Sequence, residues 1–134
     1  MAAGLLHRAL QSAGNTTPAI EVDSAGVSPY GGNAPAEAVE IMQGYGVDLT
    51  SHHAKGLSPE LVQWADLILA MSEDHRRTIV GRFADAKGKT HTFTEFVGHR
   101  GDIPDPFGCG KLTYESCARA LDRLVQLAVI KLLP

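Results

Sequence analysis

The feature that most constrains the fold is an apolar run at residues 67–71 that leads directly into a predicted helix. Polar residues stand on both sides of this run. A continuous apolar run of this length suits a strand buried on both faces, as strands of parallel sheets are. Ser72 then begins a helical pattern that extends to about Phe83. A buried strand that enters a helix is the unit from which parallel α/β sheets are built.

Strands and helices alternate along the rest of the chain. We predict strands at 19–23, 65–71 and, more weakly, 91–93, and helices at 1–10, 35–44, 59–64, 72–83 and from 114 onward. This alternation predicts a three-layer α/β/α fold on a parallel sheet with right-handed crossovers. A chain of 134 residues suffices for one such domain. We therefore expect one domain over residues 1–134, with ligands bound beyond the carboxyl ends of its strands.

The composition argues against several classes of partner. The net charge of -3 comes from acidic and basic residues mixed along the whole chain, so we expect no nucleic-acid partner and no membrane-surface partner. The longest apolar runs are far shorter than the roughly 20 residues of a membrane span. The two cysteines give no disulfide framework, and no secretory leader follows Met1. We therefore expect a soluble, cytoplasmic protein.

Several residue types are expected to be structural. The six histidines show no spacing typical of metal ligands, so we expect no metal and no other cofactor. A literal Cys-x5-Arg pattern runs from Cys117 to Arg123, but it lies in the predicted C-terminal helix, whose amides cannot cradle a phosphate. We interpret Cys117 as a core residue and Cys109 as exposed, with a redox role for Cys109 as the minority hypothesis. Trp64 and the leucines of the last helix are predicted to be core.

A loop at residues 101–108 carries the chemistry-bearing motif. Its sequence is Gly-Asp-Ile-Pro-Asp-Pro-Phe-Gly, in which Pro106 follows Asp105. A proline biases the preceding residue away from helical geometry, so the Asp105 carboxylate can be held in one orientation, as a general acid requires. The same residues are also a common turn signal.

Five blocks in order resemble the low-molecular-weight protein-tyrosine phosphatase family, whose relatives include arginine phosphatases and some arsenate reductases. The blocks lie at residues 1–6, 22–27, 46–57, 65–71 and 102–108. The first is similar to the helix that follows the family's phosphate loop, and the last is similar to its acid loop. The resemblance implies hydrolysis of phosphotyrosine or phosphoarginine through a phosphocysteine intermediate, with a phosphorylated protein or a small aryl phosphate as the partner.

The resemblance also implies roles for matched residues. Asp105 matches the general acid, which protonates the leaving group and then activates water. Ser24 and His52 match residues that support the phosphate loop. Phe107 stands where relatives place an aromatic residue at the mouth of the substrate pocket, and phenylalanine there is more like the bacterial branch.

The sequence contains no match to the family's Cys-x5-Arg-Ser phosphate loop or to the strand before it. In the four-stranded family sheet that strand is central, so its neighbours would lose ladder partners. We therefore interpret the sequence as an N-terminally truncated domain, expected to be inactive as it stands and marginally stable in thermal melting.

Three functions remain in view. The favoured hypothesis is a phosphatase whose full-length form carries the loop. The alternative is a non-catalytic binding or regulatory remnant of the fold that truly begins at Met1. Arsenate reduction ranks last because it needs two further cysteines to relay a disulfide. The choice between phosphotyrosine and phosphoarginine and the oligomeric state stay open.

The first two hypotheses predict different masses for the protein purified from its native source. We expect an intact mass larger than 14.3 kDa by roughly 2 kDa, which is about one strand plus one phosphate loop. An intact mass of 14.3 kDa would instead favour the non-catalytic remnant.

Overall fold

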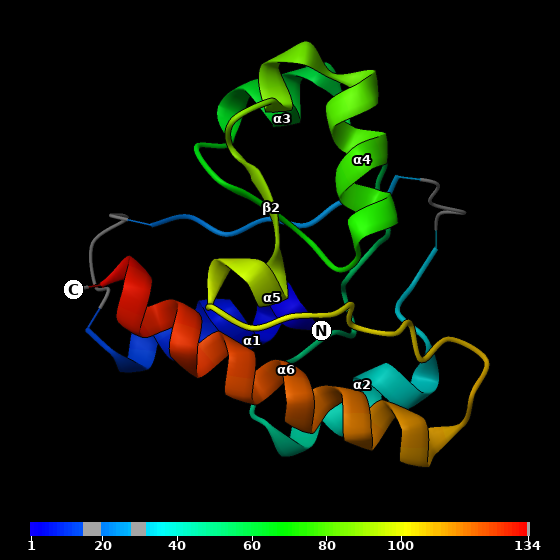
Figure 1. The fold of residues 1–134 in the computed structure, drawn as a ribbon. Coiled ribbons are helices and arrows are strands. Elements are labelled where there is room, and N and C mark those ends of the chain that lie inside the picture. Colours follow the sequence, from blue (N-terminus) through cyan, green and yellow to red (C-terminus); the bar gives the residue numbers. More distant parts are fainter. Residues whose placement is uncertain (15–19, 28–31, 134) are drawn as a thin grey trace.

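The computed structural model describes residues 1–14, 20–27 and 32–133. Its helices and strands follow one another as shown in Figure 1. In chain order they are α1 (Ala2–Ser12), α2 (Ala36–Gly44), α3 (Pro59–Trp64), β1 (Ile68–Ala70), α4 (Glu73–Arg82), a 3-10 turn (Ala84–Ala86), β2 (Thr90–Thr92), α5 (Phe93–Phe96) and α6 (Lys111–Leu132).

The sheet has two parallel strands in the part of the chain that the structure describes. Ile68, Leu69 and Ala70 of β1 stand opposite Thr90, His91 and Thr92 of β2. The connection between them runs through α4, as a parallel pairing requires. The predicted α/β class with a parallel sheet is therefore confirmed.

Two predicted strands differ from the structure. The apolar run at 65–71 forms only the three residues of β1, because its partner β2 is itself bounded by the 3-10 turn and by α5. Of the segment predicted at 19–23, residue 19 lies outside the described residues, and residues 20–23 belong to no strand. A parallel strand needs a neighbouring backbone for its ladder, and neither β1 nor β2 pairs with this segment. The chain is instead bridged further along, where Gly26 pairs with Gly56.

The two faces of the sheet contact different hydrophobic clusters. Ile68 and Ala70 of β1 belong to a small cluster with buried residues of α3, α4 and the 3-10 turn. Leu69 and Met71 pack on a larger cluster built from α1, α2, α5 and α6. Successive side chains of a strand point to opposite faces. Ile68 and Ala70 therefore face the small cluster, and Leu69 between them faces the larger one.

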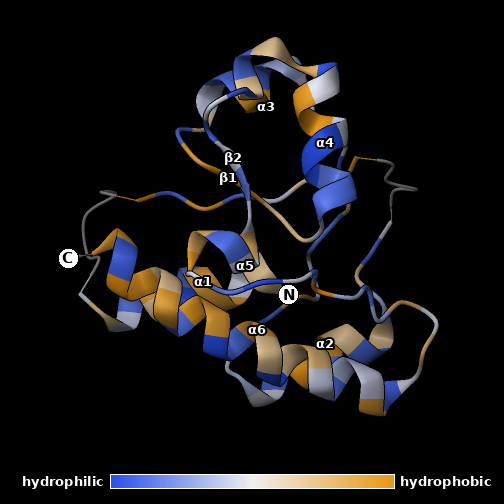
Figure 2. Cartoon of the chain, in the orientation of Figure 1, coloured by the Kyte–Doolittle hydropathy of each residue, from blue (hydrophilic) through white to orange (hydrophobic). Residues whose placement is uncertain are grey.

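The helices bury the faces that the sequence predicts, with exceptions in α3 and α6. The leucines of the last helix were predicted to be core, but Leu112 and Leu127 are exposed, because they lie on the side of α6 away from Leu121 and Val125. The long helix α6 buries Tyr114, Ala118, Leu121, Val125 and Ala128, which recur at helical spacing. Figure 2 shows hydrophobic and hydrophilic residues interspersed along this helix. Trp64 is 49% exposed, so its prediction as a core residue is wrong. It is two residues beyond Val62, the buried residue of α3, and therefore points to the other side of that helix. Among the described residues no helix is long and apolar enough to cross a membrane.

Replacing either of two helical glycines by alanine should change the stability of the protein, in opposite directions. A Cβ on Gly4 of α1 would lie 2.6 Å from Cγ1 of the buried Val47, whereas a Cβ on Gly81 of α4 would meet nothing within 4 Å. Alanine gains about 1 kcal/mol over glycine in a helix, but overpacking costs about 1–3 kcal/mol. We expect Gly81→Ala to raise the free energy of unfolding by up to about 1 kcal/mol and Gly4→Ala to lower it by up to about 2 kcal/mol.

Urea unfolding monitored by circular dichroism measures both changes. Equal stabilisation by the two substitutions would contradict the close approach of α1 to Val47.

Candidate functional site

A polar cleft of about 420 Å³ lies between α1, the segment at 22–24 and the loop at 46–52. The α1 residues that line it are Ala3, Gly4, His7, Arg8 and Gln11. Gly4, His7, Arg8 and Gln11 lie away from the buried stripe of Leu5, Leu6 and Leu10, and Ala3 lies at its edge. The amphipathic pattern of α1 therefore leaves a polar face to form one wall of the cleft.

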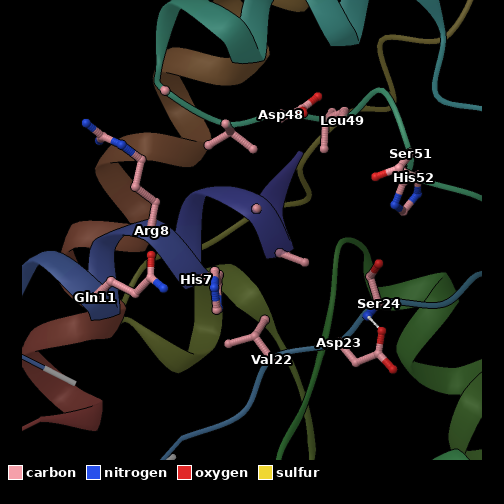
Figure 3. A pocket seen from close by; sticks show the side chains of 14 residues that line it. His7, Arg8, Gln11, Val22, Asp23, Ser24, Asp48, Leu49, Ser51 and His52 are labelled. Carbon is pink, nitrogen blue, oxygen red and sulfur yellow. Dashed lines mark hydrogen bonds between the residues drawn. The ribbon is translucent and has the colours of Figure 1, made fainter. Parts of the chain in front are cut away.

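Ser24 and His52 both line this cleft. Figure 3 shows their side chains on facing walls, directed toward each other in that view. Ser24 comes from the extended segment before the Gly26 bridge, and His52 comes from the loop after α2. Residues about 30 positions apart in the sequence are thus brought to one cleft, and their role in holding a phosphate loop stays a prediction.

The Asp23 carboxylate, which lines the cleft, bonds to Ser24 and to a lysine that follows the His52 loop. Its Oδ1 accepts a hydrogen bond from the backbone N–H of Ser24 at 2.8 Å, and its Oδ2 accepts one from the Lys55 ammonium at 2.5 Å. Partial burial acts to raise the pKa of Asp23, but the hydrogen bonds from Lys55 and Ser24 and the nearby charges of Lys55 and His52 outweigh it and lower the pKa. Sequence reasoning missed Asp23, although it directly precedes Ser24.

A local turn shapes the loop that carries His52. The Asp48 carboxylate accepts hydrogen bonds from the Thr50 backbone N–H at 2.9 Å and from the Thr50 hydroxyl at 2.6 Å. These bonds lower the pKa of Asp48. The backbone N–H of His52 donates to the Leu49 carbonyl at 3.1 Å. Aspartate commonly closes turns in this way, and here it sets the direction of the chain just before His52.

Asp105 and Phe107 lie outside the cleft. The Asp105 side chain is exposed, and its Oδ1 accepts a hydrogen bond from the Phe107 backbone N–H at 3.0 Å. The Phe107 ring is 72% exposed. Asp105 sits between Ile103 and Pro106, which are both buried. The loop therefore holds Asp105 between two buried neighbours and presents its carboxylate to solvent.

The first turn of α1 contributes to the cleft and lies near Cys117 of α6. Burial lowers the pKa of the Met1 α-amino group, and the Cys117 thiolate opposes this shift. Burial raises the pKa of Cys117; the Met1 amino group opposes that rise and the Asp105 carboxylate adds to it. Cys117 therefore interacts with both Met1 and Asp105, while Ala3, in the same helical turn as Met1, lines the cleft.

Neither cysteine belongs to a phosphate-binding loop in the described residues. Cys109 is exposed, as predicted, and Cys117 is partly buried within α6, where its thiol donates to the Pro104 carbonyl at an Sγ to O distance of 3.8 Å. Because the whole pattern from Cys117 to Arg123 is helical, it forms no phosphate-binding loop. In the ranges that the structure describes, no three or more His, Cys, Asp or Glu side chains are placed to hold a metal ion.

Comparisons with known proteins agree on one family. Residues 1–132 match the sequence profile described as low molecular weight phosphotyrosine protein phosphatase. A protein-arginine-phosphatase of Geobacillus stearothermophilus is 37% identical over 134 residues, covering 98% of this chain and 86% of the relative.

Solved structures of similar proteins have the same fold. The crystal structure of a low molecular weight protein tyrosine phosphatase from T. tengcongensis has a TM-score of 0.90 and 36% identity, covering 97% of this chain and 88% of that one. A YwlE arginine phosphatase with a phosphorylated active-site serine in place of a cysteine has a TM-score of 0.89 and 33% identity. The match covers 98% of this chain and 85% of that one.

The ion pair beside Ser24 can be tested by titration. We expect Lys55→Met to raise the pKa of Asp23 toward its ordinary value, because the substitution removes the hydrogen bond and the charge that lower it. An NMR titration of the Asp23 carboxyl carbon measures this shift. Lys111→Met, which removes a separate ion pair with Glu40, serves as the matched control and should leave the pKa of Asp23 unchanged.

The Asp23 to Lys55 pair should also make the free energy of unfolding fall as the pH becomes acidic. Because the pKa of Asp23 is lowered by folding, its contribution is present above the ordinary pKa and is lost as the pH falls through the folded value. Both side chains are partly exposed, so the contribution is about 0.2–1 kcal/mol at neutral pH. An unchanged Asp23 pKa in Lys55→Met would show that the pair does not form in solution.

Proposed function

Because the chain belongs to the low molecular weight phosphotyrosine protein phosphatase family, we propose that it dephosphorylates proteins through a phosphocysteine intermediate. The observation that carries this proposal is the position of the first turn of α1. Ala3 and Gly4 of this turn line the cleft together with Ser24 and His52. Cys117, which interacts with the start of α1, also interacts with the Asp105 carboxylate. A helix N-terminus favours the negative charge of a phosphate, so the start of α1 beside Ser24 and His52 is a suitable place for the substrate, and we propose that the Asp105 loop supplies the acid there.

The proposed functional form carries the Cys-x5-Arg-Ser loop and its strand ahead of Met1. The strand would complete a three-layer domain by filling the place between the segment at 20–23 and β1, which do not pair with each other. The loop would supply the thiolate nucleophile and an arginine that binds the phosphate with two parallel hydrogen bonds. A chain without this segment would form no phosphocysteine, so we propose that it is inactive.

The matched residues would act in sequence. The thiolate attacks phosphorus, and Asp105 donates its proton to the leaving oxygen or nitrogen as the bond to phosphorus breaks. The Asp105 carboxylate then removes a proton from water, which attacks the phosphocysteine and releases inorganic phosphate and the thiolate. Ser24 and His52 would hold the phosphate loop, and Phe107 would line the mouth of the pocket.

Phosphotyrosine and phosphoarginine are both candidate substrates, because the similar proteins include a tyrosine phosphatase and arginine phosphatases. Parallel assays on a phosphotyrosine peptide and a phosphoarginine peptide would separate the two. In either case we propose a cytoplasmic phosphoprotein as the substrate, since both cysteines are unpaired thiols.

Removal of the acid tests the proposed mechanism. In the form that carries the phosphate loop, Asp105→Asn should lower kcat on phenyl phosphate by about 10²–10⁴-fold, the usual contribution of a general acid. Asp66→Asn changes an exposed carboxylate that lies outside the acid loop and the cleft, so its activity should equal that of the wild type.

The outcomes separate the hypotheses. Activity that survives Asp105→Asn would show that another group acts as the acid. A wild-type protein that carries the loop and yet hydrolyses neither peptide would favour a non-catalytic binding role.

A further inference from the structure

The start of the acid loop is attached by three hydrogen bonds, two to the segment that follows β1 and one to α5. The Asp102 carboxylate accepts one from the backbone N–H of Glu73 at 3.0 Å. The Ile103 backbone N–H donates one to the Met71 carbonyl at 2.8 Å. The Thr94 hydroxyl donates the third to the Gly101 carbonyl. Three successive residues of the loop are thus fixed to the segment that joins β1 to α4 and to α5.

We propose that Asp102 is a positioning residue that fixes the orientation of Asp105. Its side chain is exposed and contributes nothing to either hydrophobic cluster. The backbone N–H that it binds belongs to the first residue of α4, which has no acceptor within its own helix. A carboxylate at this position forms a charge-assisted hydrogen bond and meets the positive end of the helix dipole.

The two residues between Asp102 and Asp105 can transmit this restraint. Ile103 is buried and bonded to Met71, and Pro104 has a fixed φ. On the other side of Asp105, Pro106 is buried. The backbone around Asp105 therefore has little freedom as long as the Asp102 bond holds. A general acid needs its position held within a fraction of an ångström, and a 1 Å misplacement can cost about 100-fold in rate.

The proposal rests on the proposed phosphatase function and is tested by the dependence of rate on the leaving group. In the form with the phosphate loop, kcat/KM is measured for aryl phosphates whose leaving groups span a wide range of pKa. Poor leaving groups need the acid, while activated ones such as p-nitrophenol need it less. We expect Asp102→Ala to lower kcat/KM for phenyl phosphate about 10-fold or more and for activated esters far less, since only the acid is misplaced.

Two further variants sharpen the test. Asn keeps an oxygen acceptor, so Asp102→Asn should restore most of the rate on phenyl phosphate. Asp74→Ala removes an exposed carboxylate from the same first turn of α4 without touching the acid loop and should leave the leaving-group dependence unchanged. Equal losses across all esters in Asp102→Ala, or no loss, would overturn the positioning role.

A second measurement does not depend on activity. In the 134-residue chain, Asp102→Ala should speed amide hydrogen exchange at Glu73 and Ile103 and leave exchange at the buried Leu10 unchanged, because only the loop attachment is lost. Unchanged exchange at Glu73 and Ile103 would overturn the proposal even if the protein had no phosphatase activity. If Asp102→Ala speeds exchange at Glu73 and Ile103 but the form with the phosphate loop is inactive, the attachment of the loop is supported and only the proposed phosphatase function is contradicted.

Discussion

The packing of α1 against α6 is the contact on which the rest of the structure depends. Leu5, Leu6 and Leu10 are buried in the same cluster as Leu121 and Val125 of α6. Burial of each such side chain is worth about 1.5–3 kcal/mol, a large share of the stability of a small domain. Because this stripe faces α6, the opposite face of α1 is left to form the cleft wall, and its first turn comes to lie beside Cys117.

The acid loop gains its position from the elements at both of its ends. At its start, Asp102 and Ile103 are bonded to the segment between β1 and α4. At its end it enters α6, where Lys111 pairs with Glu40 of α2 at 2.8 Å. Loops tied to rigid elements at both ends are the usual carriers of catalytic groups. The exposed tip with Phe107 is the part with the fewest restraints, which suits contact with a large substrate.

The sequence predicted patterns that depend on near neighbours and failed on those that depend on distant ones. The helix at 59–64 and the apolar stripe of the last helix were correct because helical periodicity and proline are local signals. The predicted strand lengths and the predicted burial of Trp64 were wrong, because both depend on which distant segment packs against these residues. Ser24 and His52 could be assigned to one site only through the family resemblance. The bond from Asp102 to Glu73 spans 29 residues and leaves no signal in spacing.

The candidate site therefore divides into two parts with different physical supports. Ser24 and His52 are held by turns and by the Asp23 to Lys55 pair, which is partly exposed and weakened by salt. Asp105 is held by buried neighbours and by the backbone hydrogen bond from Ile103 to Met71, which salt does not screen. The bond to the exposed Asp102 carboxylate adds a restraint that salt weakens. Rising ionic strength should thus loosen the cleft walls before it moves the acid. The response is unequal because the acid loop keeps an unscreened backbone bond and buried neighbours at high salt, whereas the Asp23 to Lys55 pair consists of two partly exposed charges.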